Sequence, residues 1–332
     1  MSATPAAAPP RQQRIEHQLG PWPLACGHTI PNAQITAVQI GALNAARSNL
    51  ILVPTSYGAR AEDLAWLAGP VLDPQRWCIV IAGMFGNGAS SSPSNSAMGL
   101  AEQGWLVRHR DNVAAQRRML QEVFGVERIP LIYGWSMGAQ QAYQWAVDHP
   151  QLVERICCVG GTARTSPHNR LFCLSLRQAL TADRHWTGSD FDAPPEQGLR
   201  TFALIYASWA ASQPFFRTIA EPVEEHVERQ WLPHYQRHDP RDLIAMLDTW
   251  LAHDVAGSLS QIRVRTAVVA GSHDLYFPPA DLQADAAAIP GADFHRIESE
   301  LGHRAGNPHS SPPEQKQLRQ IVDTLLQQTP HV

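Results

Sequence analysis

The sequence predicts an α/β fold in which a mostly parallel central sheet carries helices on both faces. Five short apolar runs, rich in β-branched residues, recur between turn signals. Each run is continuous rather than alternating, which is typical of strands buried on both faces. Helix-like stretches separate several runs, and such alternation favours a parallel sheet. The length of 332 residues fits one large domain or a core with a sizeable insertion.

The five runs are the predicted core strands. Residues 110–124 and 139–147 carry apolar side chains at helical spacing and are predicted helices. Residues 23–39 alternate more and contain turn-forming residues, so an antiparallel hairpin is expected to begin the sheet. The five runs cover residues 49–54, 77–83, 129–134, 156–160 and 266–271.

The alternation of strand and helix stops after residue 161. The chain then holds several helix-like stretches and four tryptophans but no strand-like run until the last of the five. We interpret residues 165–255 as a helical lid inserted into an α/β core of residues 15–164 and 256–332. Residues 1–14 begin with an Ala- and Pro-rich run, and we expect them to be disordered.

Composition argues against several classes of protein. Charged residues make up 17% and the formal net charge is −4, with no long run of either sign, so nothing indicates binding to nucleic acid or a membrane surface. Five cysteines without a Cys-x-x-Cys pair favour reduced thiols over a disulfide framework or a zinc site. No secretory signal and no apolar run of roughly 20 residues is present. We therefore expect a soluble cytoplasmic protein without a metal.

A Gly-x-Ser-x-Gly motif lies where a buried strand run passes into a helix. Gly134 and Gly138 flank Ser136 at this junction. A tight strand-to-helix turn needs small residues where the two elements approach, and it lifts the serine hydroxyl out of the sheet. N–H groups at the helix N-terminus favour negative charge developing on a substrate. The arrangement is typical of the nucleophile elbow of the α/β-hydrolase fold, which makes Ser136 the predicted nucleophile; a Gly/Ser turn without chemistry is the alternative.

A serine nucleophile needs a base, and the base needs an orienting acid. In this fold the three follow the chain order serine, acid, histidine. Asp274 follows the last strand run, and His303 follows a further strand-like segment at residues 292–298. We therefore predict a triad of Ser136, Asp274 and His303. The alternatives are Asp254 or Asp281 for the acid and His273, His295 or His309 for the base.

The oxyanion hole of this fold combines the N–H after the nucleophile with an N–H from the loop after an earlier strand. These are Met137 and, after the first strand run, Thr55 or Ser56. The Gly- and Ser-rich loop after residues 77–83 lies at the same edge of the sheet and is expected to shape the pocket wall. The predicted pocket residues are Met84, Phe85, Trp135 and Trp209.

His234 and His238 are four residues apart and could face one way on a helix. Pro233 and Pro240 bracket them, so any helix there is short. We interpret the two histidines as surface residues rather than metal ligands.

Four stretches of the sequence form a further pattern: residues 134–138, residues 84–94, residues 110–116 and residues 274–278. Together they resemble the homoserine O-acetyltransferase family of α/β hydrolases, over residues 30 to 325. The resemblance implies that the serine, acid and histidine of that family correspond to Ser136, Asp274 and His303. It also implies a helical lid that often forms a dimer interface, so a homodimer through the lid is expected.

The sequence departs from the true homoserine enzymes at two places. Those enzymes usually carry Asp directly after the catalytic histidine, where it helps to hold the substrate amino group, whereas this chain carries Arg304. They also carry arginines in the first lid helices that help to hold the substrate carboxylate, and residues 203–211 contain none. Without these contacts to its amino group and carboxylate, homoserine loses binding energy that apolar contacts do not replace. We therefore predict a substrate other than homoserine, with a more apolar acyl or alcohol part.

The leading hypothesis is a carboxylesterase in which water attacks an acyl-enzyme on Ser136, with His303 as general base and acid and Asp274 orienting it. The alternative is an acyl-CoA-dependent O-acyltransferase with the same triad, for which acyl-CoA is a substrate. Hydrolysis requires water to reach the acyl-enzyme, whereas acyl transfer requires the lid to exclude it. A non-catalytic binding protein is the third hypothesis, and the complete triad argues against it. No cofactor is implied, and the expected partner is a small-molecule ester or acyl donor.

Overall fold

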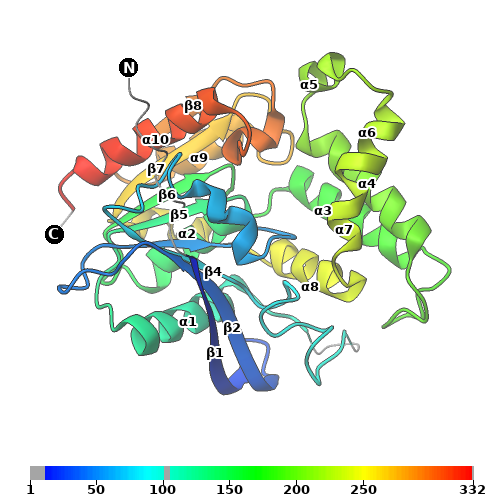
Figure 1. Cartoon of the computed structure of the whole chain (residues 1–332), viewed down its shortest axis with the longest axis horizontal. Coiled ribbons are helices and arrows are strands. Elements are labelled where there is room, and N and C mark those ends of the chain that lie inside the picture. The colour runs from blue at the N-terminus through cyan, green and yellow to red at the C-terminus, as the bar shows by residue number, and fades with distance from the viewer. Residues whose placement is uncertain (1–11, 101–104, 331–332) are drawn as a thin grey trace, which may run out of the picture.

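An eight-stranded, mostly parallel sheet forms the centre of the part of the chain that this computed structural model describes, residues 12–100 and 105–330 (Figure 1). The strand order is β1-β2-β4-β3-β5-β6-β7-β8. β2 pairs antiparallel with β1 and with β4, and the other pairs are parallel. The strands are β1 (Gln12–Pro23), β2 (Thr29–Ile40), β3 (Leu50–Pro54), β4 (Cys78–Ala82), β5 (Leu131–Trp135), β6 (Arg155–Val159), β7 (Arg265–Gly271) and β8 (Asp293–Ile297).

The central strands are buried on both faces. All residues of β3, β4 and β6 are buried. Alternate side chains of one strand enter two separate apolar clusters, because successive side chains of a strand point to opposite faces. Leu50 and Leu52 belong to the first cluster, and Ile51 and Val53 belong to the second. The predicted α/β fold with a mostly parallel sheet is therefore confirmed.

Helices cover both faces of this sheet. Side chains of α1, α2 and α9 belong to the first apolar cluster, and side chains of α10 and the 3-10 helix η1 belong to the second. None of the helices in the described ranges is long and apolar enough to cross a membrane. The bounds are η1 (Ala61–Leu67), α1 (His109–Met119), its π-helical continuation η2 (Leu120–Phe124), α2 (Met137–Asp148), η3 (Ala256–Gln261), α9 (Pro279–Ala288), η4 (Gly302–Gly306) and α10 (Pro312–Gln327).

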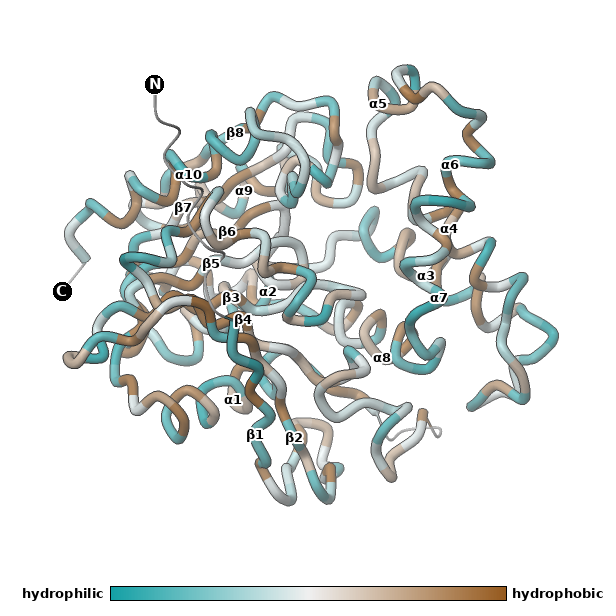
Figure 2. Tube along the Cα trace, in the orientation of Figure 1, coloured by the Kyte–Doolittle hydropathy of each residue, from teal (hydrophilic) through white to brown (hydrophobic). Residues whose placement is uncertain are grey.

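Six α-helices precede η3 in the chain between β6 and β7, and Figure 1 shows them gathered on one side of the molecule. We call residues 165–255 the lid segment. Figure 2 shows the central strands as mostly hydrophobic and the outlying helix α6 as mostly hydrophilic. The helices are α3 (Pro167–Thr181), α4 (Glu196–Ala210), α5 (Gln213–Thr218), α6 (Val223–Gln230), α7 (Leu232–Gln236) and α8 (Pro240–Leu251).

Polar contacts tie the lid segment to the core. Asp242 of α8, which is buried, accepts hydrogen bonds from the N–H and the Oγ of Ser94 at 3.0 and 2.6 Å. Arg237 donates two hydrogen bonds to Asp63 of η1, at 3.0 and 2.6 Å. The lid segment is thus fixed to the loop after β4 and to η1. The expected homodimer through it stays a prediction.

The start of the sheet differs from the sequence-based prediction. Residues 12–14, expected to be disordered, belong to β1, while residues 1–11 lie outside the described residues. The expected hairpin exists, but it is formed by β1 and β2, so its first strand lies upstream of residues 23–39. Ile15 and Leu19 are the two buried residues of β1. The backbone hydrogen bonds between β1 and β2 do not depend on apolar side chains, so an apolar run does not mark this strand.

Candidate active site

Ser136 lies in a sharp turn between β5 and α2. Its backbone has a φ of 57° and a ψ of −124°, which residues with a side chain seldom adopt. The flanking glycines provide the necessary space. A Cβ on Gly134 would lie 2.2 Å from the carbonyl oxygen of Gly138, and a Cβ on Gly138 would lie 2.5 Å from that of Pro54. The surrounding packing therefore holds the strained turn and places Ser136 at the N-terminus of α2.

A buried carboxylate–imidazole pair is formed by the loops after β7 and β8. Nδ1 of His303 lies 2.6 Å from Oδ2 of Asp274, and the two residues are 3% and 4% exposed. Oδ1 of Asp274 accepts the N–H groups of Tyr276 and Phe277, both at 3.0 Å. The carboxylate thus fixes the ring and favours the proton on Nδ1. Nε2 is left as an acceptor without a hydrogen-bond partner among the described residues.

The turn after β6 brings the serine and the histidine to one place. A Cβ on Gly161 would lie 2.4 Å from the carbonyl oxygen of Ser136, and a Cβ on Gly160 would lie 3.4 Å from Cε1 of His303. Trp135 stacks on the imidazole of His303, with 5.0 Å between ring centroids. Nε2 makes no hydrogen bond to Ser136 in the described structure, and such bonds often tighten only when substrate binds. The structure therefore brings the predicted serine, acid and histidine together.

Of the predicted oxyanion-hole residues, Thr55 does not fit. Its N–H donates to the carbonyl oxygen of Ala82 at 2.9 Å, which extends the β3–β4 ladder by one residue. The N–H groups of Ser56 and Met137 donate no hydrogen bond within the described ranges. The hydroxyl of Ser56 donates to the carbonyl oxygen of Trp135 at 2.9 Å and holds this loop against the turn. Ser56 and Met137 therefore offer the two available donors.

A cavity of about 260 Å³ opens onto His303 between the core and the lid segment. Trp135, a predicted pocket residue, belongs to its lining, whereas Ser136 is buried and does not. Arg304, which follows the histidine, also lines the cavity. Aromatic residues from both parts of the molecule complete much of the wall: Tyr57, Tyr206, Trp231, Tyr235 and Tyr276.

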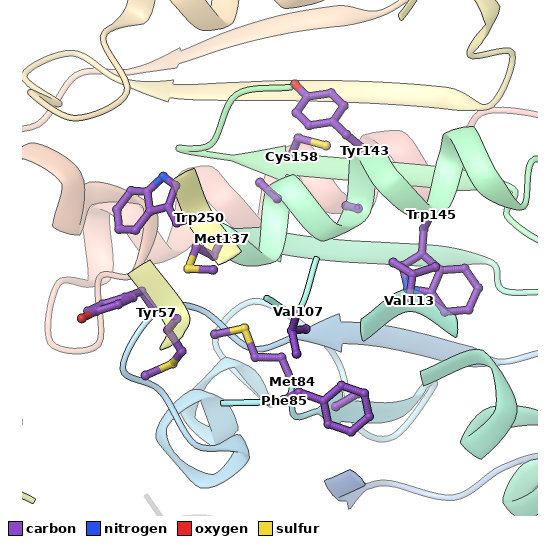
Figure 3. Packing of buried hydrophobic residues seen from close by; sticks show 14 of the residues in the cluster. Tyr57, Met84, Phe85, Val107, Val113, Met137, Tyr143, Trp145, Cys158 and Trp250 are labelled. Carbon is purple, nitrogen blue, oxygen red and sulfur yellow. The ribbon is translucent and has the colours of Figure 1, made fainter. Parts of the chain in front are cut away.

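Met84, Phe85 and Trp209, which were predicted to line the pocket, do not belong to the lining of this cavity. Met84 and Phe85 are fully buried in the first apolar cluster (Figure 3). The side chain of Asn112 accepts the N–H of Phe85 at 2.9 Å and anchors the loop to α1, so these side chains enter the core. Trp209 packs within the lid segment against His168, with 4.6 Å between ring centroids.

Sequence reasoning missed the four tyrosines of the cavity. The ring of Tyr276 lies 4.3 Å from that of His303, centroid to centroid. Burial raises the pKa of Tyr57, Tyr206, Tyr235 and Tyr276, so all four phenols are neutral at neutral pH. Tyr57 and Tyr276 could have been found, because they lie within two residues of the predicted oxyanion loop and the predicted acid. Tyr206 and Tyr235 carry no such positional signal.

The structure does not place His234 and His238 on the surface as expected. His238 is 4% exposed, and both Nε2 atoms point to Gly58, whose Cβ would lie 3.4 Å from one and 4.0 Å from the other. Burial lowers the pKa of both imidazoles to about 4. No group of three or more His, Cys, Asp or Glu side chains in the described part of the chain is placed to hold a metal ion.

The sheet, the strained serine turn and the buried acid–histidine pair together define a class of protein. A family model described as the alpha/beta hydrolase fold matches residues 50–304. The chain belongs to the α/β-hydrolase fold family, as the sequence predicts.

Similar proteins narrow this class to an esterase-like group. The chain is 35% identical over 305 residues to an ethyl acetate hydrolase of Pseudomonas veronii, covering 86% of this chain and 87% of the relative. The solved structure of the acetyl esterase MekB matches with a TM-score of 0.90 at 33% identity, covering 95% and 97% of the two chains. A homoserine O-acetyltransferase of Trichormus variabilis is 27% identical over 326 residues, covering 89% of each. The predictions of a divergent, esterase-like member of this group and of a carboxylic ester hydrolase are thus confirmed.

Proposed function

We propose that this protein hydrolyses short-chain carboxylic esters through an acyl-enzyme on Ser136. The pair of Asp274 and His303 carries the proposal, because it leaves Nε2 unpartnered next to the strained serine turn. A histidine held in this way is a general base for a hydroxyl nucleophile. The relatives named as an ethyl acetate hydrolase and an acetyl esterase support an ester substrate.

Each proton transfer has a named donor and acceptor in this mechanism. Nε2 of His303 takes the proton of Ser136 while Oγ attacks the ester carbonyl carbon. The N–H groups of Ser56 and Met137 stabilise the negative oxygen of the tetrahedral intermediate. The bond to the alcohol oxygen then breaks, and His303 returns the proton to that oxygen. In the second step a water molecule attacks the acyl carbon while Nε2 of His303 takes its proton. His303 then returns this proton to Oγ of Ser136, the acyl–serine bond breaks and the carboxylic acid is released.

The acyl part is proposed to be short because the cavity is small and its wall is made of rigid rings. The volume of about 260 Å³ must hold both the acyl and the alcohol parts of the ester. Tyr57 is anchored by a hydrogen bond from its hydroxyl to the carbonyl oxygen of Leu243, at 3.1 Å. Tyr206 and Tyr57 stack with 5.9 Å between centroids. A long acyl chain would have to displace this packing.

The second candidate is an acyl-CoA-dependent O-acyltransferase with the same residues. The similarity to homoserine O-acetyltransferases over most of the chain favours it. The acyl-enzyme would be the same, but an alcohol would replace water in the second step. Acyl-CoA would then be a substrate and not a cofactor.

Turnover of p-nitrophenyl acetate, butyrate and octanoate distinguishes these functions. The assays are run with and without excess acceptor alcohols, including homoserine. Ser136→Ala removes the nucleophile, and Ser208→Ala, at an exposed position of α4, is the matched control. Steady turnover in water, fastest for acetate and lost only in Ser136→Ala, is the expected result. A burst of one equivalent that turns over only with an acceptor would identify an acyltransferase. Unchanged turnover in Ser136→Ala would refute both.

A further inference from the structure

Arg304 follows His303 in the cavity wall, and its guanidinium donates no hydrogen bond to another described residue. Its guanidinium contacts rings of the lid segment: Cζ lies 5.7 Å from the ring centroid of Trp231 and 5.9 Å from that of Phe215. Within the described ranges it forms no ion pair or hydrogen bond. Cation–π contacts use the charge and no N–H group, so the planar fork of donors stays available.

A second donor in the same wall is also unused. Trp231 lines the cavity, and its Nε1 is buried without a hydrogen-bond partner in the part of the chain that the structure describes. A buried donor without an acceptor is costly and calls for an explanation. A ligand acceptor that contacts both Nε1 of Trp231 and the guanidinium of Arg304 would satisfy both.

Two acceptor side chains of the cavity wall, Asp63 and Asn307, are in contrast already engaged. Both oxygens of Asp63 accept hydrogen bonds from Arg237, at 3.0 and 2.6 Å. Burial acts to raise the pKa of Asp63, but these hydrogen bonds outweigh it and lower the pKa, so the group stays a paired carboxylate. Oδ1 of Asn307 accepts Nε1 of Trp66 at 2.7 Å. This part of the wall therefore offers free donors and a positive charge, which suits an acceptor-only anion.

We propose that Arg304 binds a carboxylate on the alcohol part of the ester, so that the preferred substrates are short-chain acyl esters of hydroxy acids. This inference rests on the proposed ester hydrolysis. His303 must return a proton to the leaving alcohol oxygen, which places the alcohol part on the side of the histidine and of the next residue, Arg304. A guanidinium matches the two oxygens of a carboxylate in a bidentate contact.

The test compares 3-acetoxypropanoate with 3-acetoxypropanamide, which share the acetyl group and differ in charge. We expect kcat/KM of the wild type to be about 10- to 100-fold higher for the anion, the range of a charge-assisted hydrogen bond. Arg304→Gln should lose this preference, with a fall in kcat/KM that is about 10- to 100-fold larger for the anion than for the amide. Trp231→Phe, which keeps a ring and loses Nε1, should lose a smaller part of the preference for the anion. Arg217→Gln, at an exposed lid arginine outside the cavity wall, is the matched control.

Two results would overturn the proposal. One is a wild type that shows no preference for the anion. The other is an equal loss on both esters in Arg304→Gln, which would assign Arg304 to packing of the lid. Calorimetric binding of 3-hydroxypropanoate and 3-hydroxypropanamide separates this inference from the proposed hydrolysis. Binding of 3-hydroxypropanoate alone, lost in Arg304→Gln, would support the site even if no ester turns over. Equal binding of the two compounds, or binding of neither, would contradict it.

Discussion

The sheet core and the lid segment meet at one cavity, but different interactions hold them in shape. In the core, whole strands are buried and the serine turn is fixed by close backbone contacts. In the lid segment, α5 has no buried residue, and packing depends on rings such as Phe172, which lies 5.4 Å from Tyr206 and 5.9 Å from Trp250 between centroids. The comparison indicates that backbone contacts of the core position Ser136, whereas the shape of the cavity depends on packed rings, several of them from the lid segment.

The largest effect is expected in the core, at Asp274→Asn. An amide would accept the same backbone N–H groups but donate to Nδ1 of His303, which moves the imidazole proton to Nε2 and removes the base. We expect kcat to fall by about 10⁴-fold with little loss of stability. Tyr235→Phe in the lid segment should change kcat by far less. A comparable fall in both variants would break the distinction between core and lid.

The next largest effect is expected at the backbone of the serine turn. Gly134→Ala would place a Cβ 2.2 Å from the carbonyl oxygen of Gly138, and this contact cannot relax without moving the turn. We expect a loss of about 1–3 kcal/mol in the free energy of unfolding, measured in urea, together with loss of activity. Gly257→Ala, where a Cβ meets nothing within 4 Å, is the control and should change neither. An active, fully stable Gly134→Ala would show that the turn is not tightly constrained.

A pH-dependent effect is expected from His109 of α1, which is 1% exposed and contacts Oε1 of Gln140 at 3.2 Å. Burial lowers its pKa from 6.5 to about 4. The unfolded chain takes up a proton below pH 6.5 and the folded one does so only near pH 4, so stability falls as the pH falls through this window. By pH 5 the loss is about 2 kcal/mol relative to pH 7.

His109→Gln should reduce that pH dependence, which urea unfolding at pH 7 and pH 5 would measure. His28→Gln, at an exposed histidine, is the control and should keep the wild-type slope. If the free energy of unfolding of His109→Gln changed with pH as much as that of the wild type, burial of this imidazole would not be the cause of the pH dependence.

The smallest effect is expected at the polar contact between lid and core. Arg237→Gln removes the pair with Asp63, whose side chains are 38% and 28% exposed. Partly exposed pairs are screened by solvent, so we expect a change of about 0.2–1 kcal/mol in stability, measured by urea unfolding. A loss larger than that of Gly134→Ala would mean that the lid segment depends on this contact more than on its ring packing.

The core of the molecule could be predicted from the sequence because its information is local. Continuous apolar runs identify β3 to β7, and the chain order of serine, acid and histidine follows from the motif around Ser136. Thr55 could not be excluded in this way, because the sequence does not say that the β3–β4 ladder extends one residue to Ala82. Strand register depends on tertiary pairing and not on the type of residue at the strand end.

The cavity wall was predicted poorly because it is assembled from distant segments. Tyr206 and Tyr235 come from two lid helices whose approach to His303 has no sequence signature. His234 is a further case, since its imidazole lies against Gly58, which is far away along the chain. Met84 is a further example, since an anchored loop directs it into the core rather than towards the cavity.

The central claim, an acyl-enzyme on Ser136, is tested most directly by mass spectrometry of rapidly acid-quenched protein after mixing with p-nitrophenyl acetate. The account predicts a mass increase of one acetyl group that maps to the peptide containing Ser136, decays in water and is absent from Ser136→Ala. An acetyl group on another residue, with turnover preserved in Ser136→Ala, would contradict it.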